Sequence, residues 1–259
     1  MALESLRCPG LEKTLNVFPE ILSCPICGHD IEIWTDEKKG KCTSCNRMID
    51  PRAGNGNTNK AGDNNFLIAV KEFENEAGEQ LFYERYEAVI SIADFDFNKK
   101  YKIACEACHK YGKNFACPPY SPYFQDYLGN QNAAKVICIR MPQEYFRNEI
   151  QEKIYKKCFR TARGILLKEL FDYKSQGNLV AGSGFCLGCD VCAVENGADC
   201  CQQPERKIYS LESLGVNLTS LTKRCFRFDL EWSATDHASD FVCSLGAVFM
   251  HYSDLSCTA

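Results

Sequence analysis

The stretch that decides the fold of this chain is residues 178–201, NLVAGSGFCLGCDVCAVENGADCC. Its apolar beginning, residues 178–183, predicts a buried strand. The strand runs into four cysteines, called here the second set: Cys186, Cys189, Cys192 and Cys201. A C-x2-C-x2-C run followed by a more distant Cys near a Pro is typical of [4Fe–4S] binding in bacterial-type ferredoxins. The stretch therefore predicts a metal-binding loop at the end of a strand.

Three cysteines earlier in the chain, called the first set, repeat this spacing as C-x2-C-x8-C: Cys105, Cys108 and Cys117. They provide one thiolate fewer than a cubane needs, and three interpretations stay open. The fourth ligand comes from elsewhere, as in two-cluster ferredoxins, or His109 supplies it, or one iron stays open to a substrate or water. Zinc binding or simple core packing is the rival interpretation for this set.

The N-terminal residues 1–50 contain a third arrangement, C-x2-C-x14-C-x2-C, formed by Cys24, Cys27, Cys42 and Cys45. Four thiolates in two such knuckles suit a tetrahedral structural zinc. Residues 30–34 alternate like a short strand, as a zinc-ribbon hairpin requires. A rubredoxin-like iron site is the alternative, and a ribbon of this kind would dock another protein.

Composition narrows the class of protein. The chain has 259 residues, 45% of them hydrophobic, and 18 cysteines. Its start lacks an apolar signal core, so the thiols are expected in a reducing cytoplasm, free or metal-bound. The net charge of −4 gives no attraction to nucleic acid or to an anionic membrane. The apolar segment 241–250 is too short to span a bilayer.

The chain is expected to have three parts: a zinc-ribbon-like module (1–50), a Gly- and Asn-rich linker (51–65) and an iron–sulfur-binding domain (66–259). The domain is expected to be α/β, with α+β as the alternative. Strands are predicted at residues 134–141, 178–183, 226–232 and 241–251, while 66–73 and 83–92 are apolar segments of undecided type.

The strongest helical pattern covers residues 143–173, with Pro142 expected in its first turn. Gly164 would either split this helix or allow close packing. The basic side chains along it, Lys153, Lys156, Lys157, Arg160 and Arg163, are interpreted as its solvent-facing side. Single cysteines at 138, 158, 225 and 243 are expected to behave as small buried hydrophobes.

Both sets lie in blocks that resemble a known family. Cys105-Glu-Ala-Cys108-His-Lys-Tyr-Gly with Cys117-Pro-Pro is similar to the first block of the predicted metal-binding proteins of domain-of-unknown-function family 2284. The second set, followed by Pro204-Glu205 and by Ser210-Leu-Glu212-Ser-Leu-Gly-Val, is similar to that family's second block. Gln202 and Ser213 replace its usual Arg and Ala. The position of Pro204 favours Cys201 over the adjacent Cys200 as a ligand.

The resemblance implies iron–sulfur binding in anaerobes, often near corrinoid methyl-transfer systems. The leading hypothesis is a cytoplasmic protein with one or two [4Fe–4S] clusters that exchanges electrons with a protein partner, such as a corrinoid protein. Alternatives are an enzyme that uses an open iron at the first set, and a zinc-only scaffold. No acid–base or nucleophile constellation stands out, so no catalytic residue is predicted.

Overall fold

A computed structural model describes residues 19–23, 29–34, 39–44, 48–49, 66–75, 78–146, 151–230 and 241–251. The chain divides into two units, residues 1–59 with 68–70, and residues 60–67 with 71–259. The expected linker and the cysteines at 8, 24, 27, 45 and 257 lie outside the described residues.

The N-terminal unit contains two small antiparallel sheets. Strand β1 (Pro19–Ser23) pairs with β2 (Asp30–Trp34), and β3 (Gly40–Lys41) pairs with β4 (Met48–Ile49). The strand predicted at residues 30–34 is thereby confirmed. Cys42, which directly follows β3, is fully buried.

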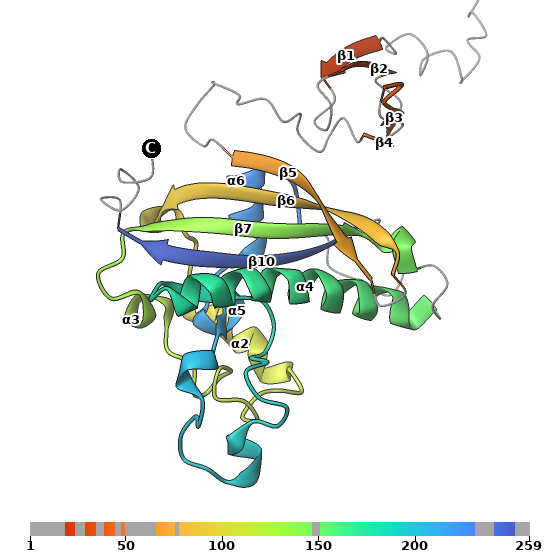
Figure 1. The fold of residues 1–259 in the computed structure, drawn as a ribbon. Coiled ribbons are helices and arrows are strands. Elements are labelled where there is room, and N and C mark those ends of the chain that lie inside the picture. Colours follow the sequence, from red (N-terminus) through yellow and green to blue (C-terminus); the bar gives the residue numbers. More distant parts are fainter. Residues whose placement is uncertain are drawn as a thin grey trace, which may run out of the picture. The chain divides into compact units, whose positions relative to one another are not determined.

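The larger unit is a mixed α/β structure around a six-stranded sheet in the order β5-β6-β7-β10-β8-β9 (Figure 1). Pairs β6–β7, β7–β10 and β10–β8 are antiparallel, and β8–β9 is parallel. The strands are β5 (Phe66–Glu74), β6 (Gln80–Ser91), β7 (Ala133–Pro142), β8 (Leu179–Gly182), β9 (Tyr209–Ser210) and β10 (Phe241–Met250). The α-helices are α2 (Lys99–Ile103), α3 (Phe124–Leu128), α4 (Gln151–Ser175), α5 (Leu211–Leu214) and α6 (Leu218–Phe226). Short 3₁₀ helices are η1 (Ile92–Asp94), η2 (Ala104–Ala107), η3 (Gln143–Phe146), η4 (Ala193–Asn196) and η5 (Pro204–Arg206).

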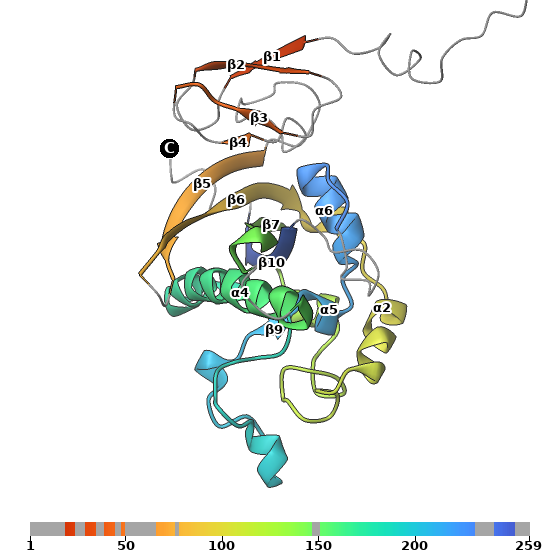
Figure 2. The same cartoon turned by 90° about the vertical axis from the view of Figure 1, so that its right-hand side faces the viewer.

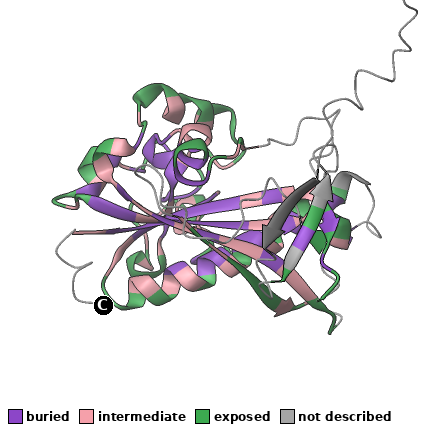
Figure 3. Cartoon of the chain, turned by 90° about the horizontal axis from the view of Figure 1, so that it is seen from above, coloured by how far each residue is buried: buried purple, intermediate pink, exposed green. Residues whose placement is uncertain are grey.

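Helix α4 covers one face of this sheet, where it contacts β7, β8 and β10 (Figures 1 and 2). Its buried stripe recurs every four residues, at Ile154, Cys158, Ala162, Leu166 and Leu170. The stripe packs on Ile137, Ile139 and Met141, alternate residues of β7. The buried stripe of the helix and the alternate residues of the strand therefore form one apolar core. In Figure 3 the central strands are coloured as buried.

Aromatic side chains cover the opposite face. Phe226 of α6 packs edge-on against Tyr86, with ring centroids 5.6 Å apart. Phe249 of β10 packs in the same way against Phe124 of α3, at 5.7 Å. Such edge-to-face pairs add to the free energy gained by burying the rings. They hold α6 against the sheet, and also α3, which lies in the same connection as the first set.

Several predicted elements are confirmed, and the differences have local causes. Segments 134–141, 178–183 and 241–251 form strands, and both undecided apolar segments are strands as well. Pro142 ends β7 instead of starting a helix, and a 3₁₀ helix precedes α4, with residues 147–150 outside the described part. The strand predicted at 226–232 is wrong for the described residues 226–230, because Phe226 ends α6 and Arg227 takes the left-handed conformation that caps that helix. Residues 231 and 232 lie outside the described part.

Gly164 neither splits α4 nor allows close packing, since a Cβ there would meet nothing within 4 Å. The close packing of α4 on the sheet requires a glycine at Gly246 of β10. A Cβ at Gly246 would lie 2.8 Å from Cδ1 of Leu170 and 3.0 Å from the carbonyl oxygen of Ala181. Helix and sheet approach each other closely at this point.

We expect Gly246→Ala to lower the free energy of unfolding by about 1–3 kcal/mol, because the added methyl group overpacks the helix–sheet contact. Gly164→Ala is the matched control and should raise it by about 0.5–1 kcal/mol, the gain from replacing an exposed helical glycine. Urea denaturation measures both. Equal midpoints for the two variants would contradict this account of the contact.

Candidate metal centre

The two cysteine sets lie in two long connections of the larger unit. The first set lies between β6 and β7, on η2 and the loop that follows it. The second lies between the parallel strands β8 and β9. Backbone hydrogen bonds join the first connection to the segment that follows β9, from Asn98 N–H to the Gly215 carbonyl and from Asn217 N–H to the Asp96 carbonyl, both 2.8 Å. Loops far apart in the sequence thereby meet beside one end of the sheet.

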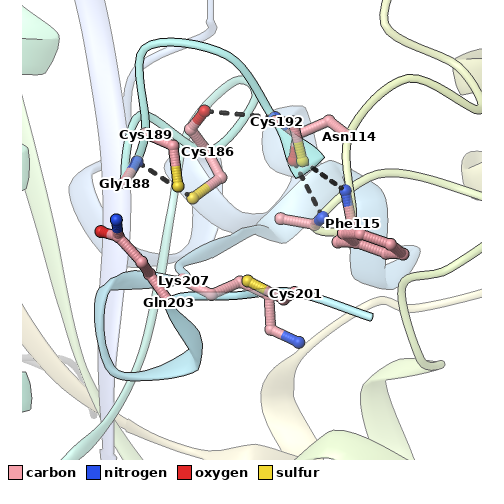
Figure 4. Close-up of a pocket in the computed structure, with 10 residues that line it drawn as sticks. Asn114, Phe115, Cys186, Gly188, Cys189, Cys192, Cys201, Gln203 and Lys207 are labelled. Atoms are coloured by element: carbon pink, nitrogen blue, oxygen red, sulfur yellow. Dashed lines mark hydrogen bonds between the residues drawn. The ribbon is translucent and has the colours of Figure 1, made fainter. Parts of the chain in front are cut away.

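All four cysteines of the second set line one cavity (Figure 4). Its walls also include Asn114, Phe115 and Ala116, which precede Cys117 in the first set's loop. The volume of this cavity is about 20 Å³, roughly the space that one water molecule needs. The cavity therefore joins the second set to the loop of the first.

Backbone amides donate to sulfur inside this cavity. Gly188 N–H donates to Cys186 Sγ at 3.3 Å, and Phe115 N–H donates to Cys192 Sγ at 3.4 Å (Figure 4). The Asn114 side chain donates to the Cys186 carbonyl at 3.3 Å and holds the two loops together. Amide–sulfur hydrogen bonds of this kind tune metal-bound thiolates.

The thiols of the first set lie close to one another and to the second set. Burial, followed by the charges of Cys108, Cys105, Cys186 and Cys192, raises the pKa of Cys117 to about 12. Burial and the neighbouring Glu212 raise the pKa of Cys105 to about 11. Without a cation these thiols stay protonated at neutral pH, so metal loading would release protons.

Arg163 corrects the interpretation of the basic side of α4. Lys153, Lys156 and Arg160 are exposed, whereas Arg163 is 5% exposed. Its guanidinium donates to the carbonyl oxygens of Ser183, at 2.7 Å, and of Phe185. Burial lowers its pKa, while Glu212, Cys186 and Cys117 act in the opposite direction. One feature of the sequence could have indicated the burial of Arg163. The residue directly follows Ala162, which belongs to the apolar stripe of the helix.

The other candidate residues differ in their placement. Cys200 is exposed and does not line the cavity, whereas Cys201 does. His109 is exposed, with its ring edge-on to Phe185 at 6.2 Å. Cys138, Cys158 and Cys225 are buried, as expected, and Cys243 is half-buried.

Within the described residues, no three His, Cys, Asp or Glu side chains converge closely enough to hold one metal ion. Tetrahedral zinc needs four donors within about 2.3 Å of its centre. An iron–sulfur cluster is larger than a single zinc ion, so its ligands lie farther apart. The four thiols that line the cavity and the two amide–sulfur hydrogen bonds fit a metal centre bound by thiolates.

The family model described as "Predicted metal-binding protein (DUF2284)" matches residues 88–249, more than half of the chain. The chain belongs to this family of predicted metal-binding proteins, as the two cysteine blocks indicated. Comparison with curated proteins and with solved structures gives no match. Among the described helices, none has both the length and the apolar character to cross a membrane.

Gly188→Ala should impair metal uptake at the second set. The added Cβ would lie 2.9 Å from the Arg206 carbonyl oxygen and would push apart two segments of the connection that carries the second set. We expect at least a twofold loss of bound metal per chain, measured by elemental analysis. Leu187→Ala, which trims an exposed side chain in the same loop, is the control and should keep wild-type metal content. Normal metal content in Gly188→Ala would contradict the role given to this glycine.

Proposed function

We propose that this protein holds [4Fe–4S] clusters at the two cysteine sets and transfers electrons to or from a protein partner. The observation that carries the proposal is the single cavity lined by the four cysteines of the second set. Such a cluster would supply reversible one-electron chemistry. The chain's own residues would bind it, donate amide hydrogen bonds to its thiolates and limit the access of water.

The burial of Arg163 supports the presence of an anionic group near its guanidinium. Burying a guanidinium without a compensating anion costs several kcal/mol, of the order given for buried ions. The described ion pairs include none to Arg163, and its acidic neighbours are cysteines and Glu212. Thiolates bound to a metal would supply the missing negative charge.

The proximity of the two sets supports electron transfer rather than two independent structural sites. Cys117 lies near enough to Cys186 and Cys192 for their charges to raise its pKa. Clusters at the two sets would therefore be neighbours. On the surface, Leu187 and Val191 lie between the cysteines of the second set and are 47% and 56% exposed. These apolar side chains suit the centre of a docking surface for a redox partner, for which a corrinoid protein is our candidate.

For the N-terminal unit we propose a structural zinc held by Cys24, Cys27, Cys42 and Cys45. The support is the pairing of β1 with β2 and of β3 with β4, together with the buried Cys42. The other three cysteines lie outside the described residues. A cytoplasmic location and an anaerobic setting belong to the same proposal, because exposed clusters and many free thiols require reducing conditions.

Cysteine substitutions test the ligand set of the second site. Cys201→Ser should remove one cluster, about four irons per chain, because Cys201 lines the cavity. Cys200→Ser changes the neighbouring exposed thiol and should keep all of the iron. Iron and acid-labile sulfide are measured on anaerobically purified protein. A colourless wild-type protein that contains zinc without iron or sulfide would overturn the proposal in favour of a zinc scaffold.

Arg163 gives a redox test. A buried cation stabilises the more negative reduced cluster, so Arg163→Gln should lower the midpoint potential by on the order of 60 mV, a tenfold change for one electron. Arg163→Lys keeps the charge and should stay nearer to wild type. Arg160→Gln removes an exposed charge from the same helix and is the control. Redox titration followed by EPR gives the potentials, and equal values for the two Gln variants would contradict the role of Arg163.

A further inference from the structure

Residues 98–113 carry a local excess of positive charge. They include five lysines and one carboxylate, Glu106, which gives this segment a net charge of +4 in a chain whose net charge is −4. Three of the lysines, Lys99, Lys100 and Lys102, lie within the five residues of α2. Figure 2 shows α2 at the periphery of the larger unit, just before the loop of the first set. The positive charge therefore leads directly into that loop.

Lys102 closes the base of this loop. Its ammonium group donates to the carbonyl oxygens of Ser121 and of Pro122, the latter at 3.2 Å. It also lies 4.5 Å from the centre of the Tyr123 ring. The loop between these contacts, residues 103–120, contains the first set and the part of the cavity wall described above. Helix α2 is therefore fixed relative to the loop that reaches the cavity.

The other two lysines of α2 are exposed, and each lies over the ring of a tyrosine. The Lys99 ammonium is 4.9 Å from the centre of the Tyr123 ring. The Lys100 ammonium is 4.9 Å from the centre of the Tyr101 ring. None of the described ion pairs includes either lysine. A ring that already restricts a lysine lowers the entropy cost of ordering it against a partner, so both groups are suited to bind an anion.

Exposed apolar and aromatic side chains accompany these charges. Ile103, at the end of α2, is 58% exposed, and Tyr123 is 40% exposed. Covering such side chains with a partner protein is favourable, and tyrosine is enriched in protein interfaces. Nucleic acid would be repelled by the remainder of this chain, which is net negative, whereas a protein with one acidic patch would not. The combination therefore favours an acidic protein as the partner.

We propose that Lys99, Lys100, Ile103 and Tyr123 form a docking surface, called here the α2 surface, for a redox protein with an acidic patch. Carboxylates of the partner would pair with the two ammonium groups, while Ile103 and Tyr123 supply the apolar part of the contact. Complementary charge of this kind acts mainly on the rate of association. This inference rests on the proposed electron transfer and adds the charge of the partner and the residues that receive it.

Removing the two charges tests the α2 surface. The probe is a reduced bacterial-type ferredoxin of acidic net charge, mixed with the anaerobic full-length protein in a stopped-flow instrument. At low salt, Lys99→Gln/Lys100→Gln should lower the second-order rate constant of electron transfer about tenfold, because electrostatic steering is lost. The difference should vanish near 1 M salt, where the Debye length is about 3 Å.

The matched control is Lys153→Gln/Lys156→Gln, which removes two exposed charges from α4 and should react at the wild-type rate. Equal rate constants for the two double variants would overturn the α2 surface and leave the proposed function intact. A wild-type rate that does not fall with rising salt would do the same. Wild-type protein without iron and sulfide would instead refute the proposed function itself.

A second measurement needs neither a variant nor electron transfer. Carbodiimide joins lysines to carboxylates that are in direct contact, and the probe is the same ferredoxin in its oxidised form. We expect a cross-linked peptide that contains Lys99 or Lys100, identified by mass spectrometry. Cross-links confined to other lysines, or none, would overturn the proposal. Binding of a labelled single-stranded RNA that is lost in Lys99→Gln/Lys100→Gln would also overturn it, in favour of nucleic acid as the partner.

Discussion

The buried guanidinium of Arg163 connects the core of this protein to its candidate metal site. Arg163 lies on α4, the helix that covers the sheet, and its hydrogen bonds end on the carbonyls of Ser183 and Phe185, just before Cys186. The position of the second set therefore depends on the packing of α4. The same buried charge requires anions nearby, and those present are thiol groups and a carboxylate. Fold and site are coupled by one side chain.

The remaining architecture supports this coupling through two long connections on a mostly antiparallel sheet. The second set directly follows strand β8. The aromatic contacts of Phe124 and Phe226 hold α3 and α6 against the sheet. Binding residues on loops that a packed scaffold positions are a common arrangement. Here the loops are also tied to each other, by Asn114 bonding to the Cys186 carbonyl and by Phe115 N–H bonding to Cys192. A metal centre bound in one loop would therefore be sensitive to changes in the other loop.

Periodicity predicted the elements that bury a whole face. Strands β7 and β10 consist mostly of apolar residues, and α4 repeats its apolar stripe for several turns, so each was evident from the sequence. The error at residues 226–232 arose where aromatic residues pack on β6 from the end of a helix. An aromatic pair such as Phe226 and Phe228 fits a strand and a helix end equally well, and only the contact with Tyr86 decides between them. Sheet order was equally unreadable, because it depends on pairings between distant segments.

The sequence by itself determined the candidate donors, because thiol chemistry and the C-x2-C spacing are local properties of the chain. It also determined the family, through two blocks that the family model covers. Tertiary structure decided which groups surround those donors. The sequence predicted that Arg163 faces solvent, and the packing of α4 places it in the core. The burial of a side chain and its distance from other charges depend on residues far apart in the sequence. The spacing of residues along the chain therefore cannot predict them.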